Sequence, residues 1–390
     1  MSDKLKYDHR GVSASKSEVH KAIKGQDKGL YPNAFCKILP DHAGGDENYC
    51  NLMHADTAGT KAGLAYLYWK ETGDLSVWKG IARDAIVMNV DDMACVGCYN
   101  NLLLSSTIGR NKNLIPGEVI EQIISAAGEF ADQMAEYGVE IHLAGGETAD
   151  VGDIVRTIDV GYTAFGRLHR KDLIVNDIEE GLEIVGLASS GQTEYETTYN
   201  SGIGSNGLTS ARHDLLSKYY DQNFKEAYDP LVPETYRFTG PYRLGDEVEI
   251  DGQKHRIGKL MLSPTRTFLP FFARHINKYQ GEIKGIIHCT GGGLTKSSKF
   301  TAGYHVIKDN LLPVTPIFNL IRETTDTPWR EMVQVFNLGT RLEIYCRPEV
   351  SAELIKDAQS MGIEADVIGR VEKHKGTSLT IEGDFGRLEF

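Results

Sequence analysis

Short apolar runs recur along the chain, and segments with helical periodicity separate them. Three of these runs, at 51–56, 140–144 and 282–288, have the length and composition of buried strands. Between them, the spacing of apolar residues predicts helices at 78–96 and 117–137. Strands that alternate with helices are typical of α/β and α+β folds, so this pattern restricts the chain to those classes.

The length indicates two domains. The chain has 390 residues, more than most single domains contain. A polar stretch at 170–181 separates two groups of strands, and it predicts an N-terminal domain of residues 1–172 and a C-terminal α/β domain of residues 173–390. Within the second half, 246–257 has the pattern of an added β-hairpin that turns at Asp251-Gly252.

Charge and hydropathy exclude several classes of protein. The 42 Lys and Arg against 54 Asp and Glu give a net charge of −12, which argues against a broad nucleic-acid or anionic-membrane surface. No apolar run approaches the ~20 residues that cross a bilayer. The polar start, residues 1–6, lacks the apolar region of a signal peptide. We therefore expect a cytoplasmic protein whose six cysteines are reduced.

Acids from separate segments indicate a site for a divalent cation. Asp56 and Glu147 each follow a predicted strand beside glycines, and Asp91-Asp92 lies in a helical segment. Acids that converge repel one another, and Mg²⁺ held between carboxylates and substrate phosphates relieves that repulsion. Lys61, close to Asp56, is placed to reach a transferring phosphoryl group. Any one of these acids taken alone is more often a helix cap or a surface ion partner.

Glycine clusters suggest phosphate binding. Thr290-Gly-Gly-Gly293 lies between a strand and a helix start, where backbone N–H groups can point at an anion, although a tight turn explains the run equally well. Gly202-x-Gly204-x-x-Gly207 matches the dinucleotide motif literally. A polar loop precedes it instead of a strand, so a loop that enters a helix is the expected structure.

The histidines and the paired cysteines give weaker signals. His54, His142 and His288 lie in apolar strand patterns without a common metal spacing, so we expect core or supporting roles for them. Cys95-x-x-Cys98 has no second Cys or His pair at zinc spacing, and both thiols are expected to be small buried hydrophobes.

Motifs that run in order over nearly the whole chain resemble those of the phosphoribosylformylglycinamidine cyclo-ligase family, also called aminoimidazole ribonucleotide synthetases, of purine biosynthesis. Each motif is modest alone, and their common order makes the resemblance specific. The segments that match or are similar to family motifs are Tyr7-x-x-x-Gly11-Val12, Asp56-Thr-Ala-Gly-Thr-Lys61, Gly145-Gly-Glu-Thr-Ala149, Ser205-Asn-Gly207, Pro264-Thr-Arg266, His288-Cys-Thr-Gly-Gly-Gly293 and Phe336-Asn-x-Gly339.

The resemblance implies a fold and a reaction. The implied fold has an N-terminal sheet that pairs with a second copy into a dimeric barrel, a C-terminal α/β half, and an ATP site between them. The implied enzyme is a homodimeric, ATP-dependent C–N ligase that binds a small nucleotide substrate and no nucleic acid or membrane. It activates the formamide oxygen of formylglycinamidine ribonucleotide with phosphate, and the ring of aminoimidazole ribonucleotide then closes by intramolecular attack.

The resemblance also implies roles for individual residues. It implies Mg²⁺ ligands at Asp56, Asp92 and Glu147 and catalytic roles for Lys61, Asp56 and Asn206, with Lys61 on the transferring phosphoryl group. The implied nucleotide-binding set is Asp56, Thr60, Lys61, Asp92, Gly145, Gly146, Glu147, Asn206, Thr290, Gly291, Gly292 and Gly293.

Departures from the family pattern bear on the substrate more than on the ATP site. The segment 29–36 stands in place of an early glycine-rich loop of the family, without that loop's glycines. Asp91 stands where the family has Asn, and Gly204 where it often has His. Lys296-Ser297 replaces Glu-Asn, and Gly339-Thr-Arg341 replaces Gly-Val-Gly. Two alternatives therefore stay open. One is another ATP-dependent synthetase or kinase of the superfamily, such as selenophosphate synthetase or thiamine-phosphate kinase. The other is a nucleotide-binding paralogue without turnover.

Overall fold

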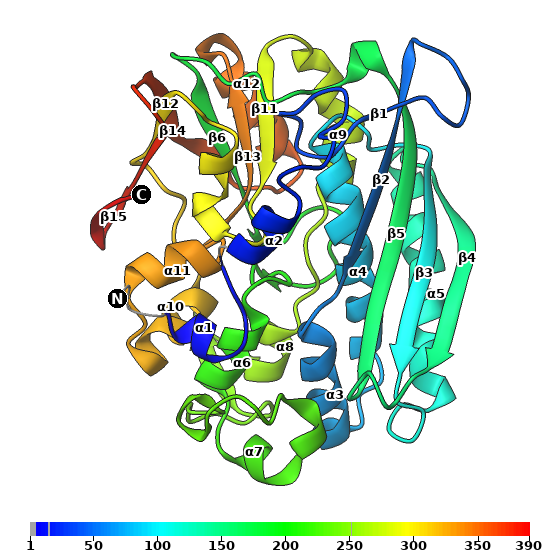
Figure 1. The fold of residues 1–390 in the computed structure, drawn as a ribbon. Helices are drawn as coiled ribbons and strands as arrows, with labels where there is room; N and C mark the ends of the chain where they lie inside the picture. The colour runs from blue at the N-terminus through cyan, green and yellow to red at the C-terminus, as the bar shows by residue number, and fades with distance from the viewer. Residues whose placement is uncertain (1–4, 15, 251) are drawn as a thin grey trace.

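A computed structural model describes residues 5–14, 16–250 and 252–390 of the chain. The polar start 1–4 and the hairpin residue Asp251 lie outside the described residues. Two sheets lie on either side of one long helix, α4 (Val77–Ala94), and Figure 1 shows α4 between them.

The first sheet has five strands in the order β1-β2-β5-β3-β4. Only β3 and β4 run parallel, while β2 and β3 both pair antiparallel with β5. Its strands confirm the predicted runs at 51–56 and 140–144, and their bounds are β1 (Leu39–Pro40), β2 (Tyr49–Thr57), β3 (Leu102–Arg110), β4 (Ile141–Asp150) and β5 (Ile158–His169).

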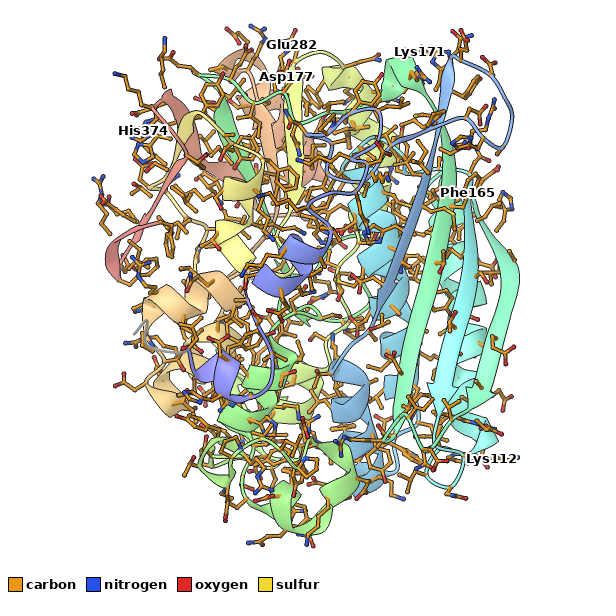
Figure 2. The ribbon with its side chains drawn as sticks, viewed as in Figure 1. Lys112, Phe165, Lys171, Asp177, Glu282 and His374 are labelled. Carbon is orange, nitrogen blue, oxygen red and sulfur yellow. The ribbon has the colours of Figure 1, made fainter. Side chains whose placement is uncertain are left out.

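Helices cover one face of this sheet. They are α3 (Lys61–Thr72), α4 and α5 (Gly117–Glu136), and the short helices α1 (Lys6–His9) and α2 (Ser17–Ala22) belong to the N-terminal arm. The other face is open. Met53, Phe165 and Leu103 lie in one cross-strand row on it, with Met53 61% and Leu103 42% exposed. Figure 2 labels Phe165 on β5.

Helix α3 was not predicted, and its burial explains why. It buries residues on every side, from Ala62 to Tyr68, between α4 and the C-terminal half. A helix that is covered all round has no apolar stripe, so the 3.6-residue period that identifies α4 and α5 is missing from its sequence.

The second sheet has seven strands in the order β11-β13-β6-β14-β12-β15-β16. Most neighbours are antiparallel, and only β12 pairs parallel with β15. The strands are β6 (Glu183–Ala188), β11 (Ile283–His288), β12 (Tyr304–Lys308), β13 (Thr340–Cys346), β14 (Ala365–Lys373), β15 (Ser378–Gly383) and β16 (Gly386–Glu389).

Helices and short elements surround this sheet. The helices are α6 (Leu208–Leu215), α7 (Tyr219–Asn223), α8 (Ile257–Met261), α9 (Leu269–His275), α10 (Pro316–Thr325), α11 (Trp329–Val335) and α12 (Pro348–Ser360). The short strands are β7 (Ser190–Gly191), β8 (Asn200–Ser201) and the predicted hairpin β9 (Glu247–Ile250) with β10 (Gln253–Arg256). In the described part of the chain, no helix is both long and apolar enough to cross a membrane.

Two buried aspartates of α4 join the halves of the molecule. Asp84 Oδ1 accepts hydrogen bonds from Lys61 Nζ at 2.9 Å and from the backbone N–H of Thr265 at 2.7 Å. About two turns further along the same helix, Asp91 accepts hydrogen bonds from Thr267 Oγ1 at 2.6 Å and from the backbone N–H of Phe268 at 2.9 Å. The segment 263–268 is therefore held along α4 by charge-assisted hydrogen bonds.

Candidate active site

A carboxylate on α4 lies between two histidines that come from different sheets. Asp92 Oδ1 is 2.7 Å from Nδ1 of His288 at the end of β11, and Asp92 Oδ2 is 3.4 Å from Nε2 of His54 on β2. Burial alone would raise the pKa of Asp92. The charge of Lys296 and the hydrogen bonds from both histidines outweigh burial and hold that pKa well below its usual range, so the carboxylate stays ionised.

The hydrogen-bonded chain continues beyond both histidines. Arg341 Nε donates to His288 Nε2 at 2.9 Å, and His54 Nδ1 is 3.1 Å from Asn89 Oδ1. Because Arg341 can only donate, Nε2 of His288 accepts and its Nδ1 carries the proton toward Asp92. Burial and the charge of Arg341 lower the pKa of His288 to about 4, so this histidine is neutral at pH 7.

His54, the second histidine that contacts Asp92, has a raised pKa. Burial opposes its protonation, but the hydrogen bond and the charge of Asp92 outweigh burial and raise its pKa above the usual value. Its side chain is 24% exposed, so a substrate can contact it. A histidine that a carboxylate orients, and whose pKa the same carboxylate raises, has the properties of a general acid or base.

Asp56 lies beside this series of hydrogen-bonded side chains, two residues after His54 and on the same face of β2. Burial, with repulsion from Asp92, raises the pKa of Asp56, although the backbone N–H of Thr57 donates to its Oδ1 at 2.7 Å. The charge of Lys16, from the N-terminal arm, acts in the opposite direction. The structure thus brings Asp56 and Asp92 close together.

The glycine-rich loop and the Ser-Asn-Gly loop face each other at this site. A Cβ on Gly291 would lie 4.0 Å from Asn206 Nδ2, and Asn206 Oδ1 is buried without a protein partner. A Cβ on Gly293, whose φ is +51°, would lie 2.3 Å from the carbonyl oxygen of Phe336, so only glycine fits there. Lys296 donates to Thr290 Oγ1, and its Nζ lies 4.4 Å from the ring centroid of Phe35.

The prediction that Lys61 reaches a phosphoryl group is wrong for this structure. Lys61 is fully buried, and its Nζ is bonded to Asp84 Oδ1 at 2.9 Å and to the carbonyl oxygen of Ser263 at 2.5 Å. The lysine is the first residue of α3, and its side chain runs into the joint with α4 instead of toward Asp56. Sequence proximity to Asp56 did not reveal this, because Asp84 and Ser263 lie far away in the chain.

The structure does not bring Glu147 together with Asp56 and Asp92, contrary to the prediction of one metal site. Glu147 pairs with Thr107 on β3, and Asp56 pairs with Tyr162 on β5. Strand side chains alternate between faces, so this register puts Glu147 on the open face of the sheet and Asp56 on the helix-covered face. Gly145 and Gly146 share β4 with Glu147, and so they too lie away from the Asp56 site.

The remaining motifs have mostly structural roles. Cys95 and Cys98 are buried free thiols, as predicted. The Gly202–Gly207 loop leads into α6, as predicted, and follows the two-residue strand β8. His142 is exposed on β4 and lies 3.8 Å from Glu140. His142 is thus the one of the three histidines that lies away from the site. The roles of His54 and His288 were not recognised, because their common partner, Asp92, is distant in sequence.

The acids of one chain fit a metal ion only in part. Among the described residues, no group of three or more His, Cys, Asp or Glu is arranged to hold a metal. Asp92 is committed to two histidines, whereas Asp56 accepts one backbone hydrogen bond and keeps oxygen capacity. Mg²⁺ commonly binds through one or two carboxylates together with substrate phosphates. The donor set therefore fits an ion that arrives with a nucleotide, with Asp56 as its protein ligand.

Comparisons with known proteins agree with this architecture. The domain described as "AIR synthase related protein, N-terminal domain" matches residues 34–168, and its C-terminal counterpart matches residues 261–382. A phosphoribosylformylglycinamidine cyclo-ligase of Methanocaldococcus jannaschii is 28% identical over 326 residues, which cover 83% of this chain and 79% of the relative. The enzyme of that name from Methanococcus vannielii is 27% identical over 377 residues, covering 96% and 89%.

Solved structures share the fold at low sequence identity. "T. maritima PurL complexed with FGAR" has a TM-score of 0.57 at 15% identity and covers 96% of this chain, which spans only 49% of the PurL chain. "AaThiL complexed with AMPPCP and TMP" has a TM-score of 0.53 at 11% identity and covers 94% of this chain and 92% of its own. These likenesses establish the two-sheet architecture and nothing about ligands.

Proposed function

Because the chain belongs to the AIR synthase related family, we propose that it converts formylglycinamidine ribonucleotide and ATP into aminoimidazole ribonucleotide, ADP and phosphate. The observation that carries the proposal is the chain of contacts from His54 through Asp92 to His288, with Asp56 beside it. It joins the two sheets opposite a glycine-rich loop, where a nucleotide and an acceptor can meet.

The proposed reaction has two steps. The formamide oxygen attacks the terminal phosphorus of ATP, and ADP leaves with the electron pair of the broken P–O bond. The amidine nitrogen then attacks the activated carbon, phosphate leaves, and the nitrogen loses a proton as the ring closes. Both steps gain from holding the reacting groups in contact, because the second is intramolecular and the first needs alignment.

We assign proton transfer in ring closure to His54. Its pKa is raised by Asp92 and its ring is partly exposed, and it would take the proton at Nδ1 when substrate displaces the contact of Nδ1 with Asn89 Oδ1 at 3.1 Å. Asp92 orients the ring and stabilises its protonated form, and His288 with Arg341 fixes the carboxylate from the other side. Asn206 and the loop from Thr290 to Gly293 are assigned to phosphate or nucleotide contacts through their N–H groups.

We assign Asp56 to the Mg²⁺ ion that accompanies ATP. The assignment is supported by the free oxygen capacity of Asp56 and by its position next to the catalytic histidine. When bound there, the ion would screen the polyphosphate from two nearby carboxylates. Residues 1–172 would then form the nucleotide-binding and dimerisation domain.

We also propose a cytoplasmic homodimer. Each chain would contribute the open face of its five-stranded sheet, where Met53, Phe165 and Leu103 form an exposed apolar row. A face of this kind, on a sheet whose other side is covered by helices, is a natural site for a second copy of the same sheet.

The test is an assay of ADP release with formylglycinamidine ribonucleotide. Substrate-dependent ADP release together with an aminoimidazole product supports the proposal. Turnover of ATP only with a different acceptor would replace the substrate, and nucleotide binding without turnover would leave a non-catalytic paralogue. Asp56→Asn should abolish Mg²⁺-dependent turnover. Glu121→Gln, which changes an exposed acid on α5, is the matched control and should retain full activity.

A further inference from the structure

A cavity lies next to the proposed active site and plays no part in the chemistry described above. Its volume is about 340 Å³, and it is bounded by the loop at Gly59 and Thr60, by α6, and by the segment 226–232. Helices α3 and α6 contact each other here, in the lower part of Figure 1. Thr60 follows Asp56 by four residues, so the cavity adjoins the site where nucleotide chemistry is proposed.

The wall of this cavity contains a buried cation that has no anionic partner. Arg212 is only 2% exposed, and among its contacts one Nη donates to the carbonyl oxygen of Ala227 while Nε has no partner. No carboxylate lies within ion-pair distance of it in the described residues. The other buried cations differ: carboxylates lie within 3 Å of Arg10, Lys61, Arg266 and Lys308, and Arg341 interacts with Asp91 and Asp92.

Burying an unpaired guanidinium disfavours its charged form, and this effect is seen in the pKa of Arg212. Burial alone lowers the pKa of Arg212 to about 10, with no opposing charge. A charge is taken from water at a cost of several kcal/mol unless a counter-charge replaces the solvent. An anion that enters the cavity would supply the counter-charge that the buried Arg212 lacks, and so would be bound favourably.

Two helix N-termini at the cavity also favour an anion. The first turns of α3 and α6 both lack a side-chain cap and both lack an acidic residue. The N-terminal turn of a helix carries partial positive charge and unpaired N–H groups, which Asp or Ser usually satisfies. Thr60 at the start of α3 and Thr209 in the first turn of α6 line the cavity, and their hydroxyl oxygens are 2.7 Å apart.

The acids that line the cavity are already engaged. Asp229 lies 3.3 Å from Arg156 at the mouth, and Glu226 accepts a hydrogen bond from Tyr66 at 2.8 Å. Arg10 also lines the cavity, but it is paired with Asp214 at 2.7 Å. Among the described lining residues, Arg212 is therefore the buried cation without a carboxylate at ion-pair distance, while Glu226 is held by the neutral hydroxyl of Tyr66.

We propose that this cavity binds a phosphate monoester group, held by Arg212 and by the hydroxyls of Thr60 and Thr209. Arginine and hydroxyl donors around two helix N-termini match the oxygens of a phosphate dianion. The identity of the ligand rests on the proposed function: the phosphate is that of the ribonucleotide substrate, anchored away from the formamide group that reacts. The presence of an anion site rests only on the geometry of the cavity.

Binding of ribose 5-phosphate to the full-length protein, measured by calorimetry without ATP, tests the proposal. We expect Arg212→Met to weaken binding by at least about tenfold, since a hydrogen bond to a charged group is lost. Its melting temperature without ligand should not fall, because an unpaired buried charge is removed. Arg243→Gln, which removes an exposed arginine of the same region, is the matched control and should bind normally. Equal affinity of Arg212→Met and the parent protein would overturn the proposal.

Two further measurements keep the proposal testable. If Arg212→Met does not fold, Thr209→Val should still weaken binding, and unchanged affinity in that variant would count against the site. In turnover assays, Arg212→Met should raise KM for the ribonucleotide and leave KM for ATP unchanged. ADP binding that depends on Arg212, with ribose 5-phosphate binding that does not, would overturn the assignment to the substrate. Absence of turnover in the parent protein would refute the proposed reaction and leave the binding result valid.

Discussion

Asp92 Oδ1 lies 2.7 Å from His288 Nδ1, so a carboxylate from the helix between the sheets is held by a histidine of the far sheet. The same carboxylate contacts His54 of the near sheet at 3.4 Å. We predict that Asp92→Asn lowers the rate of ADP release by about 100-fold or more, because the amide cannot stabilise a protonated His54. Circular dichroism should be unchanged. A variant that keeps the parent rate would remove Asp92 from the mechanism.

The pH dependence of turnover should report His54. As a base, His54 must be neutral, and Asp92 raises its pKa above the usual value of a histidine. We therefore expect kcat/KM to rise with pH through a pKa above ~6.5 and then to level off. His54→Gln should lose that limb and about two orders of magnitude in rate. The control is His374→Gln, which changes an exposed histidine far from α4, labelled in Figure 2. An unchanged profile in His54→Gln would reassign the base.

Lys61 should behave as a structural residue. Lys61→Met leaves Asp84 buried without its cation, and breaking a buried pair in this way costs about 3–5 kcal/mol in the free energy of unfolding. The double variant Lys61→Met/Asp84→Leu should recover part of that loss, because no charge is left unpaired. Denaturant titration measures both. A stable Lys61→Met that has lost only turnover would restore the catalytic role that its sequence position suggested.

Asp91 should make stability depend on pH. Burial raises the pKa of Asp91 to about 7, despite hydrogen bonds from Thr267 and Phe268. The folded state therefore holds a proton that the unfolded state releases near pH 4. Its contribution to stability is complete below that pH and is lost as the pH rises through about 7. Asp91→Asn cannot ionise, so its free energy of unfolding should change less between pH 5 and 8. Equal pH slopes for both proteins would contradict this assignment.

The open face of the first sheet should mediate dimerisation. We expect Met53→Lys and Leu103→Lys to yield monomers in light scattering, because each places a charge in an apolar contact between sheets. Ile154→Lys is the matched control: it adds the same charge at an exposed apolar residue that is not part of the row Met53–Phe165–Leu103. A parent protein that is already monomeric at micromolar concentration would refute the proposed dimer.

The elements that the sequence predicted well are those with a period. Helices α4 and α5 have amphipathic or strongly apolar patterns, and β2 and β11 are short apolar runs that end at the site. Helix α3 was missed because it is covered on all sides. Local pattern therefore predicted much of the framework, and it failed where burial was uniform.

The candidate site was predicted less completely, for a different reason. Asp56 and Asp92 were found because each stands beside a recognisable motif. The fate of Lys61 and Glu147 depended on long-range contacts: a buried partner at Asp84 for one, and the register between β3 and β4 for the other. His54 was undervalued because the carboxylate that activates it follows 38 positions later in the chain. Such relationships leave no local trace in one sequence.

The hydrogen bonds that Asp84 and Asp91 accept from residues 265–268 have a consequence for the autonomy of the two halves. If the chain is cut near residue 172, one fragment retains Asp84 and Asp91 without the donors of residues 265–268, and the other retains those donors without their aspartates. Each fragment would expose raw polar surface at the severed joint. We therefore expect the two halves to unfold together in one transition, and neither piece should be expressible as a well-behaved protein by itself.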